Sequence, residues 1–191
     1  MEFVYPPSDD SAQTLDVSLS ILRSICEKKG EISLVEVGSG SGYVIGQLVE
    51  EMVKINCRYK ALIGIDINPH AARLTSLASD SIDSIRSDLL SSLRPMKVDL
   101  VIFNLPYLLG PRRSGDVDWM DASIYINYLR NDLIDVFLRQ VKDLNVEFTV
   151  ITYSSESMSL VETAAKAGGF TIMRRAVKHV FFEDIITSVL R

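Results

Sequence analysis

The chain has 191 residues, of which 47% are hydrophobic, and it carries a formal net charge of −5. This length and composition suit one domain with a substantial buried core, while no apolar run reaches the roughly 18 residues that a membrane helix needs. The acidic balance, with Arg112-Arg113 and Arg174-Arg175 as short basic pairs, argues against direct nucleic-acid binding, which favours a basic surface.

The two cysteines, Cys26 and Cys57, lie far apart in the sequence and form no C-x-x-C pair. Neither His70 nor His179 has a second histidine or a cysteine at the spacing of metal ligands. We therefore expect neither a disulfide framework nor a metal site, and a reducing cytoplasm is the default compartment. The first residues also lack the basic and then apolar pattern of a secretory signal.

Helical and apolar patterns alternate along the chain. A loop rich in proline, serine and aspartate covers residues 1–11, and a helix is predicted at 12–29, where Gly30 follows a basic end. Strands are then predicted at 32–37, 61–65, 82–87, 98–103 and 148–153, and helices at 43–54, 69–78, 124–141 and 158–167. Two final strands are predicted at 170–175 and 179–190, close enough to pair in an antiparallel way.

Strands that alternate with helices predict an α/β fold with a mostly parallel, doubly wound sheet and an antiparallel C-terminal strand. We expect a single Rossmann-like domain over residues 1–191. Ligands of such sheets bind at the carboxyl ends of the strands. Four candidate site segments follow predicted strands in this way.

The first segment is Gly-Ser-Gly-Ser-Gly at 38–42. Glycine permits positive φ and close approach of a ligand to the backbone, so Gly38, Gly40 and Gly42 are candidate cofactor-binding residues. The alternative is an ordinary strand-to-helix turn. Position 43 is Tyr where a dinucleotide fingerprint has its third glycine, and no lysine follows the last glycine as a P-loop requires.

Two aspartates follow the next strands. Asp66 can accept hydrogen bonds from two ribose hydroxyls, or it can cap the helix that begins at Pro69, a role that Asn68 fills equally well. Asp88 can hold an adenine amino group or cap a turn, and the residues alone leave both open.

The last segment, Asn104-Leu105-Pro106-Tyr107, follows the buried strand predicted at 98–103. By itself it also suits an ordinary turn. In a site, the Asn104 side-chain oxygen and the Leu105 carbonyl could each accept one N–H of a planar amide, while Tyr107 offers a flat face. Two such acceptors favour a tetrahedral nitrogen whose lone pair is free. Positioning then supplies the catalysis, and no general base with a shifted pKa is required.

The ordered set of these motifs resembles the class I methyltransferases, and Asn104–Tyr107 is similar to the N-P-P-Y signature of amino-group methyltransferases. The chain most resembles the HemK-like glutamine methyltransferases of translation release factors, in their short eukaryotic and archaeal branch, which long carried the label of adenine-specific DNA methylases. Tyr-Pro-Pro-Ser-Asp-Asp-Ser at 5–11 is similar to that branch's Y-E-P-x-E-D-S segment, so residues 1–30 are expected to cover the cofactor site.

The resemblance implies an S-adenosylmethionine-dependent enzyme that methylates the side-chain amide nitrogen of a glutamine in a class 1 release factor. It implies Asn104, Leu105, Pro106 and Tyr107 as catalytic residues, and a cofactor site made by Gly38, Gly40, Gly42, Asp66, Asp88 and Asn104. One alternative is an adenine methyltransferase acting on nucleic acid. Another is a catalytically weakened scaffold, because Leu105 replaces a proline of the family and residues 119–124 contain no glycine.

The resemblance also implies a heterodimer with a small zinc-binding activator that adds a strand to the sheet. The weak strand at 82–87 is the candidate edge, and the mean hydropathy of +0.18 is apolar for a small enzyme. The alternative is that the chain's own N-terminal helix covers this edge and leaves a monomer.

Overall fold

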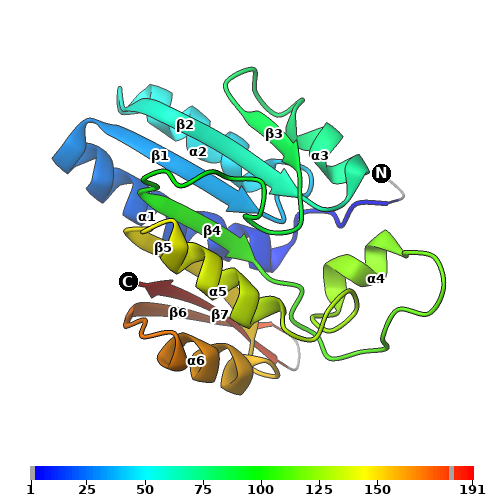
Figure 1. The fold of residues 1–191 in the computed structure, drawn as a ribbon. Helices are drawn as coiled ribbons and strands as arrows, with labels where there is room; N and C mark the ends of the chain where they lie inside the picture. Colours follow the sequence, from blue (N-terminus) through cyan, green and yellow to red (C-terminus); the bar gives the residue numbers. More distant parts are fainter. Residues whose placement is uncertain (1–2, 181–182) are drawn as a thin grey trace.

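The structure is a computed structural model that describes residues 3–180 and 183–191. Its centre is a seven-stranded sheet in the order β3-β2-β1-β4-β5-β7-β6 (Figure 1). The strands are β1 Glu31–Val37, β2 Arg58–Asp66, β3 Asp83–Arg86, β4 Leu100–Asn104, β5 Phe148–Ser154, β6 Ile172–Val180 and β7 Glu183–Leu190. The helices are α1 Asp9–Lys29, α2 Tyr43–Lys54, α3 Pro69–Thr75, α4 Trp119–Ile124, α5 Leu133–Asp143 and α6 Met158–Ala167.

The first five strands run parallel, and β7 pairs antiparallel with β5 on one side and β6 on the other. This confirms the predicted mostly parallel sheet with its antiparallel C-terminal part. Residues 181–182, which fall inside the strand predicted at 179–190, lie outside the described residues.

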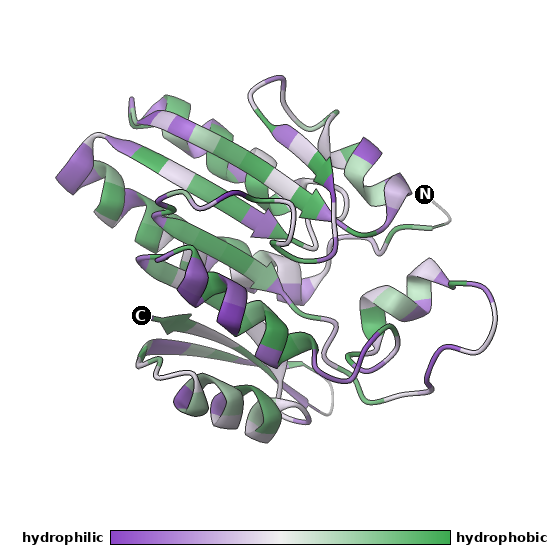
Figure 2. Cartoon of the chain, viewed as in Figure 1, coloured by the Kyte–Doolittle hydropathy of each residue, from purple (hydrophilic) through white to green (hydrophobic). Residues whose placement is uncertain are grey.

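Helices bury both faces of the sheet, which is why its strands are almost continuously apolar. On β1, Leu34 belongs to a core shared with α1 and α2, whereas Val35 and Val37 belong to a second core shared with α5 and α6. Figure 2 shows the resulting pattern, with β4 hydrophobic along its length and polar residues on the outer side of α5. None of the described helices is long and apolar enough to cross a membrane.

The prediction of a helix at 124–141 is wrong for the first part of that range. Helix α4 ends at Ile124, α5 begins at Leu133, and the chain between them is not helical. The Leu108 N–H donates to the Ile124 carbonyl and the Ile126 N–H donates to the Leu108 carbonyl, so pairing with a distant segment replaces helical bonds here. Tertiary pairing of this kind overrides a weak local preference for helix.

The expectation that the cysteines stay apart is also wrong. A disulfide joins Cys26, near the end of α1, to Cys57, just before β2. The fold brings the two residues together because α1 and the start of β2 meet at the same end of the sheet, which their separation of 31 residues did not reveal. The inference from unpaired cysteines to a reducing compartment therefore loses its basis.

This disulfide should stabilise the fold measurably. We expect the Cys26→Ala/Cys57→Ala variant to have a free energy of unfolding about 2–4 kcal/mol lower than the wild type without reductant, because the crosslink restricts the unfolded chain. Urea denaturation followed by circular dichroism measures the difference. A dithiol reductant should lower the wild-type midpoint and leave that of the variant unchanged. Equal wild-type midpoints with and without reductant would contradict the prediction.

Strand β3 forms one edge of the sheet, as predicted for the segment 82–87. The helix α1 does not cover this edge, because it packs on α2 and on β1, β4 and β5, farther along the sheet. Large apolar side chains are exposed at the end of α2 (Val53 and Ile55), on β2, the neighbour of β3 (Tyr59), and in the connection between α3 and β3 (Leu77).

Candidate active site

A cavity of about 320 Å³ lies at the carboxyl ends of the strands. It is lined by the N-terminal segment, the glycine loop, the ends of β2 and β4, and the chain around α4. The predicted site residues that reach this cavity are Gly38, Gly40, Asp66, Asp88, Asn104, Leu105, Pro106 and Tyr107. Gly42 is not part of the lining.

The glycine loop has the backbone conformation that was predicted for it. Gly38, Gly40 and Gly42 have φ values of 63°, 56° and 77°, a region that favours glycine. At Gly42 a Cβ atom would lie 2.8 Å from the Cβ of Ala78. Gly42 therefore allows the start of α2 to pack closely against the end of α3, whereas Gly38 and Gly40 form part of the wall of the cavity.

Asp66 ends β2 and links it to the glycine loop. Its Oδ2 accepts the Gly40 N–H at 2.9 Å and its Oδ1 accepts the Asn68 N–H at 2.9 Å. Desolvation raises the pKa of Asp66, against the opposing effect of these N–H donors. The Asn68 side chain accepts the His70 N–H and caps α3. Capping of this helix, which was the alternative role for Asp66, is therefore done by Asn68.

Asp88 has a partner that the sequence did not suggest. Its side chain is 51% exposed at the rim of the cavity, and its Oδ2 accepts a hydrogen bond from Arg130 Nη1 at 2.9 Å. Arg130 also pairs with Asp132. Asp88 thus joins the end of β3 to the segment between α4 and α5.

At the end of β4, the Asn104 side chain donates from Nδ2 to Asp10 Oδ2 at 3.1 Å, and Tyr107 donates its hydroxyl to the same oxygen at 3.2 Å. Asn104 Oδ1 is buried and has no hydrogen-bond partner among the described residues. Burial, and then the charge of Asp10, raise the pKa of the Tyr107 phenol, which stays a donor. The cavity wall therefore presents a free acceptor beside an aromatic ring.

No family model matches the sequence. Methyltransferase HEMK2 of Homo sapiens is 30% identical over 148 residues, which cover 74% of this chain and 66% of the human protein. A Methanocaldococcus jannaschii protein named "Putative protein N5-glutamine methyltransferase" is 30% identical over 112 residues, which cover 55% of this chain and 48% of that protein. This chain belongs to the HemK-like methyltransferase family. It spans about two thirds of the human relative and about half of the archaeal one.

The fold of this HemK-like chain is also found among solved structures. The E. cuniculi Mtq2–Trm112 complex, described as responsible for methylation of the eRF1 translation termination factor, matches with a TM-score of 0.64 at 21% identity. The match covers 100% of this chain and 98% of that chain. At this level of identity the likeness shows the fold.

Two acidic residues in the wall of this HemK-like site were not predicted as site residues. Glu36 is 3% exposed, and its Oε2 accepts the Ile45 N–H at 3.0 Å. Desolvation raises its pKa from 4.5 to about 8. The signal for Glu36 was an acid inside a mostly apolar strand, two residues before the glycine loop. Asp10 lay within the N-terminal motif, but nothing in the sequence linked it to Asn104.

In this HemK-like chain we expect Asp66→Ala to weaken binding of S-adenosylmethionine about 10- to 100-fold. Two ribose hydroxyls bonded to a charged acceptor would account for roughly 1.5–3 kcal/mol of binding free energy. Titration calorimetry measures the affinity, and Asp80→Ala, an aspartate outside the cavity, is the matched control. The same affinity for both variants would show that Asp66 does not contact the cofactor.

Leu105 differs from the family's proline, and its backbone shows what that proline would change. The Leu105 N–H donates to the Thr152 carbonyl at 3.0 Å and ties the end of β4 to β5. Leu105→Pro removes this donor, so we expect the free energy of unfolding to fall by about 1–3 kcal/mol. Urea denaturation measures the loss, with Leu105→Ile as the control that keeps the N–H. A proline variant with a higher free energy of unfolding than the wild type would show that the Leu105 N–H does not stabilise the fold.

Proposed function

We propose that the chain is an S-adenosylmethionine-dependent methyltransferase that methylates the side-chain amide nitrogen of a glutamine in a class 1 translation release factor. The observation that carries this proposal is the buried, unpartnered Asn104 Oδ1 beside Tyr107, in the part of the chain that the structure describes. A buried acceptor without a donor raises the free energy of the folded protein, and a substrate N–H bonded to Asn104 Oδ1 would remove that penalty.

The lining of the cavity fits the cofactor at several points. Asp66 offers two carboxylate oxygens for the ribose hydroxyls, and Glu36 is a buried acid suited to a cationic methionine part. Gly38 and Gly40 allow close approach of the ligand to the backbone. The bound cofactor would supply an electrophilic methyl group on a sulfonium.

The chain's own residues would hold the substrate nitrogen. Asn104 Oδ1 accepts one N–H of the amide, the Leu105 carbonyl accepts the other, and Tyr107 packs its ring against the amide plane. Among the described residues no hydrogen bond to the Leu105 carbonyl is formed, so this acceptor is available. The nitrogen releases one of its two protons to solvent when it gains the methyl group, and the sulfonium becomes a neutral thioether. The reaction otherwise relies on placement, because the described part of the cavity wall contains no histidine.

The site would accept an adenine amino group by the same contacts, so an adenine methyltransferase is the second candidate. The net charge of −5 disfavours it, because the chain has few cations to neutralise phosphates. The protein substrate also agrees with the names of the archaeal relative and of the E. cuniculi complex. A release-factor substrate would place the chain in the cytoplasm with the translation machinery.

The proposal includes a small zinc-binding activator as the partner in a heterodimer. Support comes from the uncovered edge strand β3 and from the exposed apolar side chains nearby, including Tyr59 and Leu77. An added strand would satisfy the backbone groups of β3 and hide apolar surface together.

The test is a labelled-methyl transfer assay that offers release factor, DNA and RNA separately, with the chain alone and with the activator. We expect transfer to release factor and improved soluble yield with the activator. Transfer to DNA or RNA alone would establish the adenine alternative. Cofactor binding without transfer to any acceptor, with the activator present, would indicate a scaffold. A monodisperse, fully active monomer unaffected by the activator would remove the partner from the proposal.

A further inference from the structure

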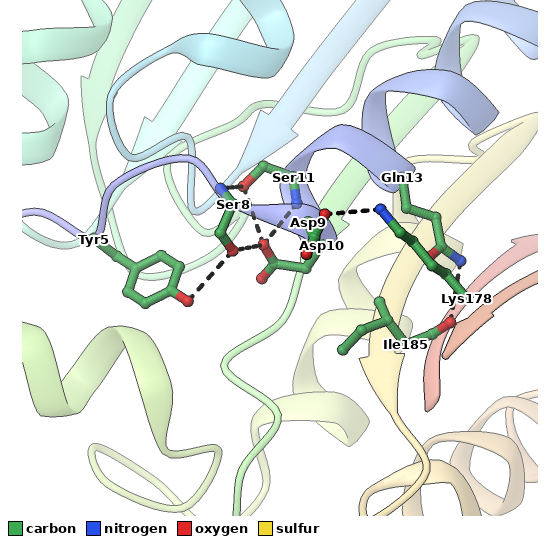
Figure 3. A network of polar contacts seen from close by, with 8 residues as sticks. All are labelled: Tyr5, Ser8, Asp9, Asp10, Ser11, Gln13, Lys178 and Ile185. Atoms are coloured by element: carbon green, nitrogen blue, oxygen red, sulfur yellow. Dashed lines mark hydrogen bonds and ion pairs between the residues drawn. The ribbon is translucent and has the colours of Figure 1, made fainter. Parts of the chain in front are cut away.

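Asp10 lies in the first turn of α1 and is only 4% exposed, and the segment that carries it crosses the carboxyl ends of the strands. Its two oxygens face different groups. Oδ1 accepts from the Ser8 hydroxyl at 2.6 Å and from the Ser11 N–H at 2.7 Å, as Figure 3 shows. Oδ2 accepts from Asn104 and Tyr107. Every one of these neighbours is a donor, which suits a carboxylate.

The charge on Asp10 determines which way the Asn104 amide faces. An asparagine side chain presents an NH₂ group on one side and an oxygen on the other. With a carboxylate opposite, only the NH₂ side can face Asp10, because the reversed amide would set two acceptors against each other. The remaining oxygen, Asn104 Oδ1, is the one left buried and, among the described residues, unpartnered. The same carboxylate oxygen holds the Tyr107 hydroxyl and thereby fixes the ring beside Asn104.

We propose that Asp10 is a positioning residue that orients the Asn104 amide and Tyr107 so that Asn104 Oδ1 accepts a hydrogen bond from the substrate nitrogen. This inference rests on the proposed function and deepens it. A site with a fixed acceptor selects a nitrogen that still carries N–H groups, so Asp10 contributes to substrate choice without touching the substrate. Without the charge on Asp10, the Asn104 amide can rotate and present its NH₂ group to the substrate. An NH₂ group cannot accept a hydrogen bond from the substrate N–H.

Asp9 provides a matched control, because it precedes Asp10 in the same helical turn. Its side chain is 55% exposed and pairs with Lys178 at 2.7 Å (Figure 3), and Asp9 is not part of the cavity lining. Asp9→Asn and Asp10→Asn remove the same charge from the start of α1. Any effect on the helix dipole is therefore shared, whereas the contact with Asn104 is lost only in Asp10→Asn.

The first experiment compares steady-state methyl transfer by the variants, with the activator if the wild type requires it. For Asp10→Asn we expect kcat to fall about 10- to 100-fold relative to Asp9→Asn, with cofactor affinity within about threefold. Asp10→Asn/Asn104→Asp exchanges the two groups, since an amide at position 10 can then donate to a carboxylate at position 104. We expect this double variant to have at least about ten times the kcat of Asp10→Asn. A kcat equal to that of Asp9→Asn would overturn the proposal, as would a double variant no better than the single one.

The second experiment does not depend on activity. The side-chain ¹⁵N–H₂ resonances of Asn104, assigned with Asn104→Ala, should shift in Asp10→Asn and stay in place in Asp9→Asn. If the wild type transfers no methyl group to any acceptor, the proposed function fails, while these resonances still confirm or refute the contact with Asp10. If Asp10→Asn does not fold, Asp10→Glu replaces it, because it keeps the charge at the start of α1 and displaces the carboxylate from Asn104 Nδ2 by one methylene group. Unchanged Asn104 resonances in Asp10→Glu would then refute the proposal.

Discussion

Asn104→Ala should lower the rate of methyl transfer at least about 100- to 1000-fold, the range seen when one preorganised polar contact is removed from a reacting centre. The variant loses both the proposed acceptor for the substrate N–H and the donor to Asp10. The glycine loop and Asp66, which we propose to bind the cofactor, are unchanged, so we expect cofactor affinity to stay within a few fold of the wild type.

The measurement is kcat on the acceptor that the transfer assay identifies, with calorimetry for the cofactor. Asn131→Ala, an exposed asparagine outside the cavity, is the matched control and should keep wild-type rates. Near-normal turnover by Asn104→Ala would refute the amide-nitrogen mechanism. A lost cofactor affinity would instead show that Asn104 acts mainly in cofactor binding.

Glu36→Gln should make the ligand-free protein more stable at pH 8 by roughly 3–5 kcal/mol. The pKa of Glu36 is about 8 in the folded chain instead of 4.5, because burial disfavours the charged form. Between these two pH values the unfolded chain has released the proton that the folded chain still holds. The free energy of unfolding therefore falls as the pH rises from about 4.5 to about 8, and it falls no further above that.

Urea denaturation at several pH values between about 5 and 8 measures this effect, and the contribution of Glu36 should vanish in the Gln variant. Glu50→Gln, an exposed glutamate on α2, should retain the wild-type pH profile. Glu36→Gln should also bind S-adenosylmethionine more weakly, because a cationic ligand favours the ionised acid. Wild-type affinity should accordingly rise with pH up to about 8. Parallel stability profiles for wild type and Glu36→Gln would contradict the assignment.

The fold was largely predictable because each central strand is a short apolar run bounded by a polar or glycine residue. Burial on both faces demands such runs, so β1, β4 and β5 were visible from composition alone. The chain from 125 to 132 was not, because Ile126 and Leu129 have helical spacing while the backbone of this segment pairs elsewhere. Local patterns carry no information on that pairing.

The candidate site was predictable where a motif ends a strand, since all parallel strands end at the same edge. Asp66 and Asn104 lie at this edge as expected. The links between motifs were not predictable, because they depend on three-dimensional neighbours. Asp10 meets Asn104 across 94 residues and Arg130 meets Asp88 across 42, and no local feature signals either contact. The Cys26–Cys57 bond was missed for the same reason.

The helix that carries Asp10 is braced by the strands farthest from it in the chain. Gln13 donates to the carbonyl of Ile185 in β7, across 172 residues (Figure 3). It also donates to the carbonyl of Ala176 in β6, across 163 residues. During synthesis on the ribosome, α1 leaves the exit tunnel long before these strands exist. The N-terminal part of α1 therefore gains its complete set of contacts only after β6 and β7 have been made and paired, and contacts of such long range form slowly. We expect nascent chains that stop before β6 to lack an ordered Asp10–Asn104 contact even after the glycine loop has folded.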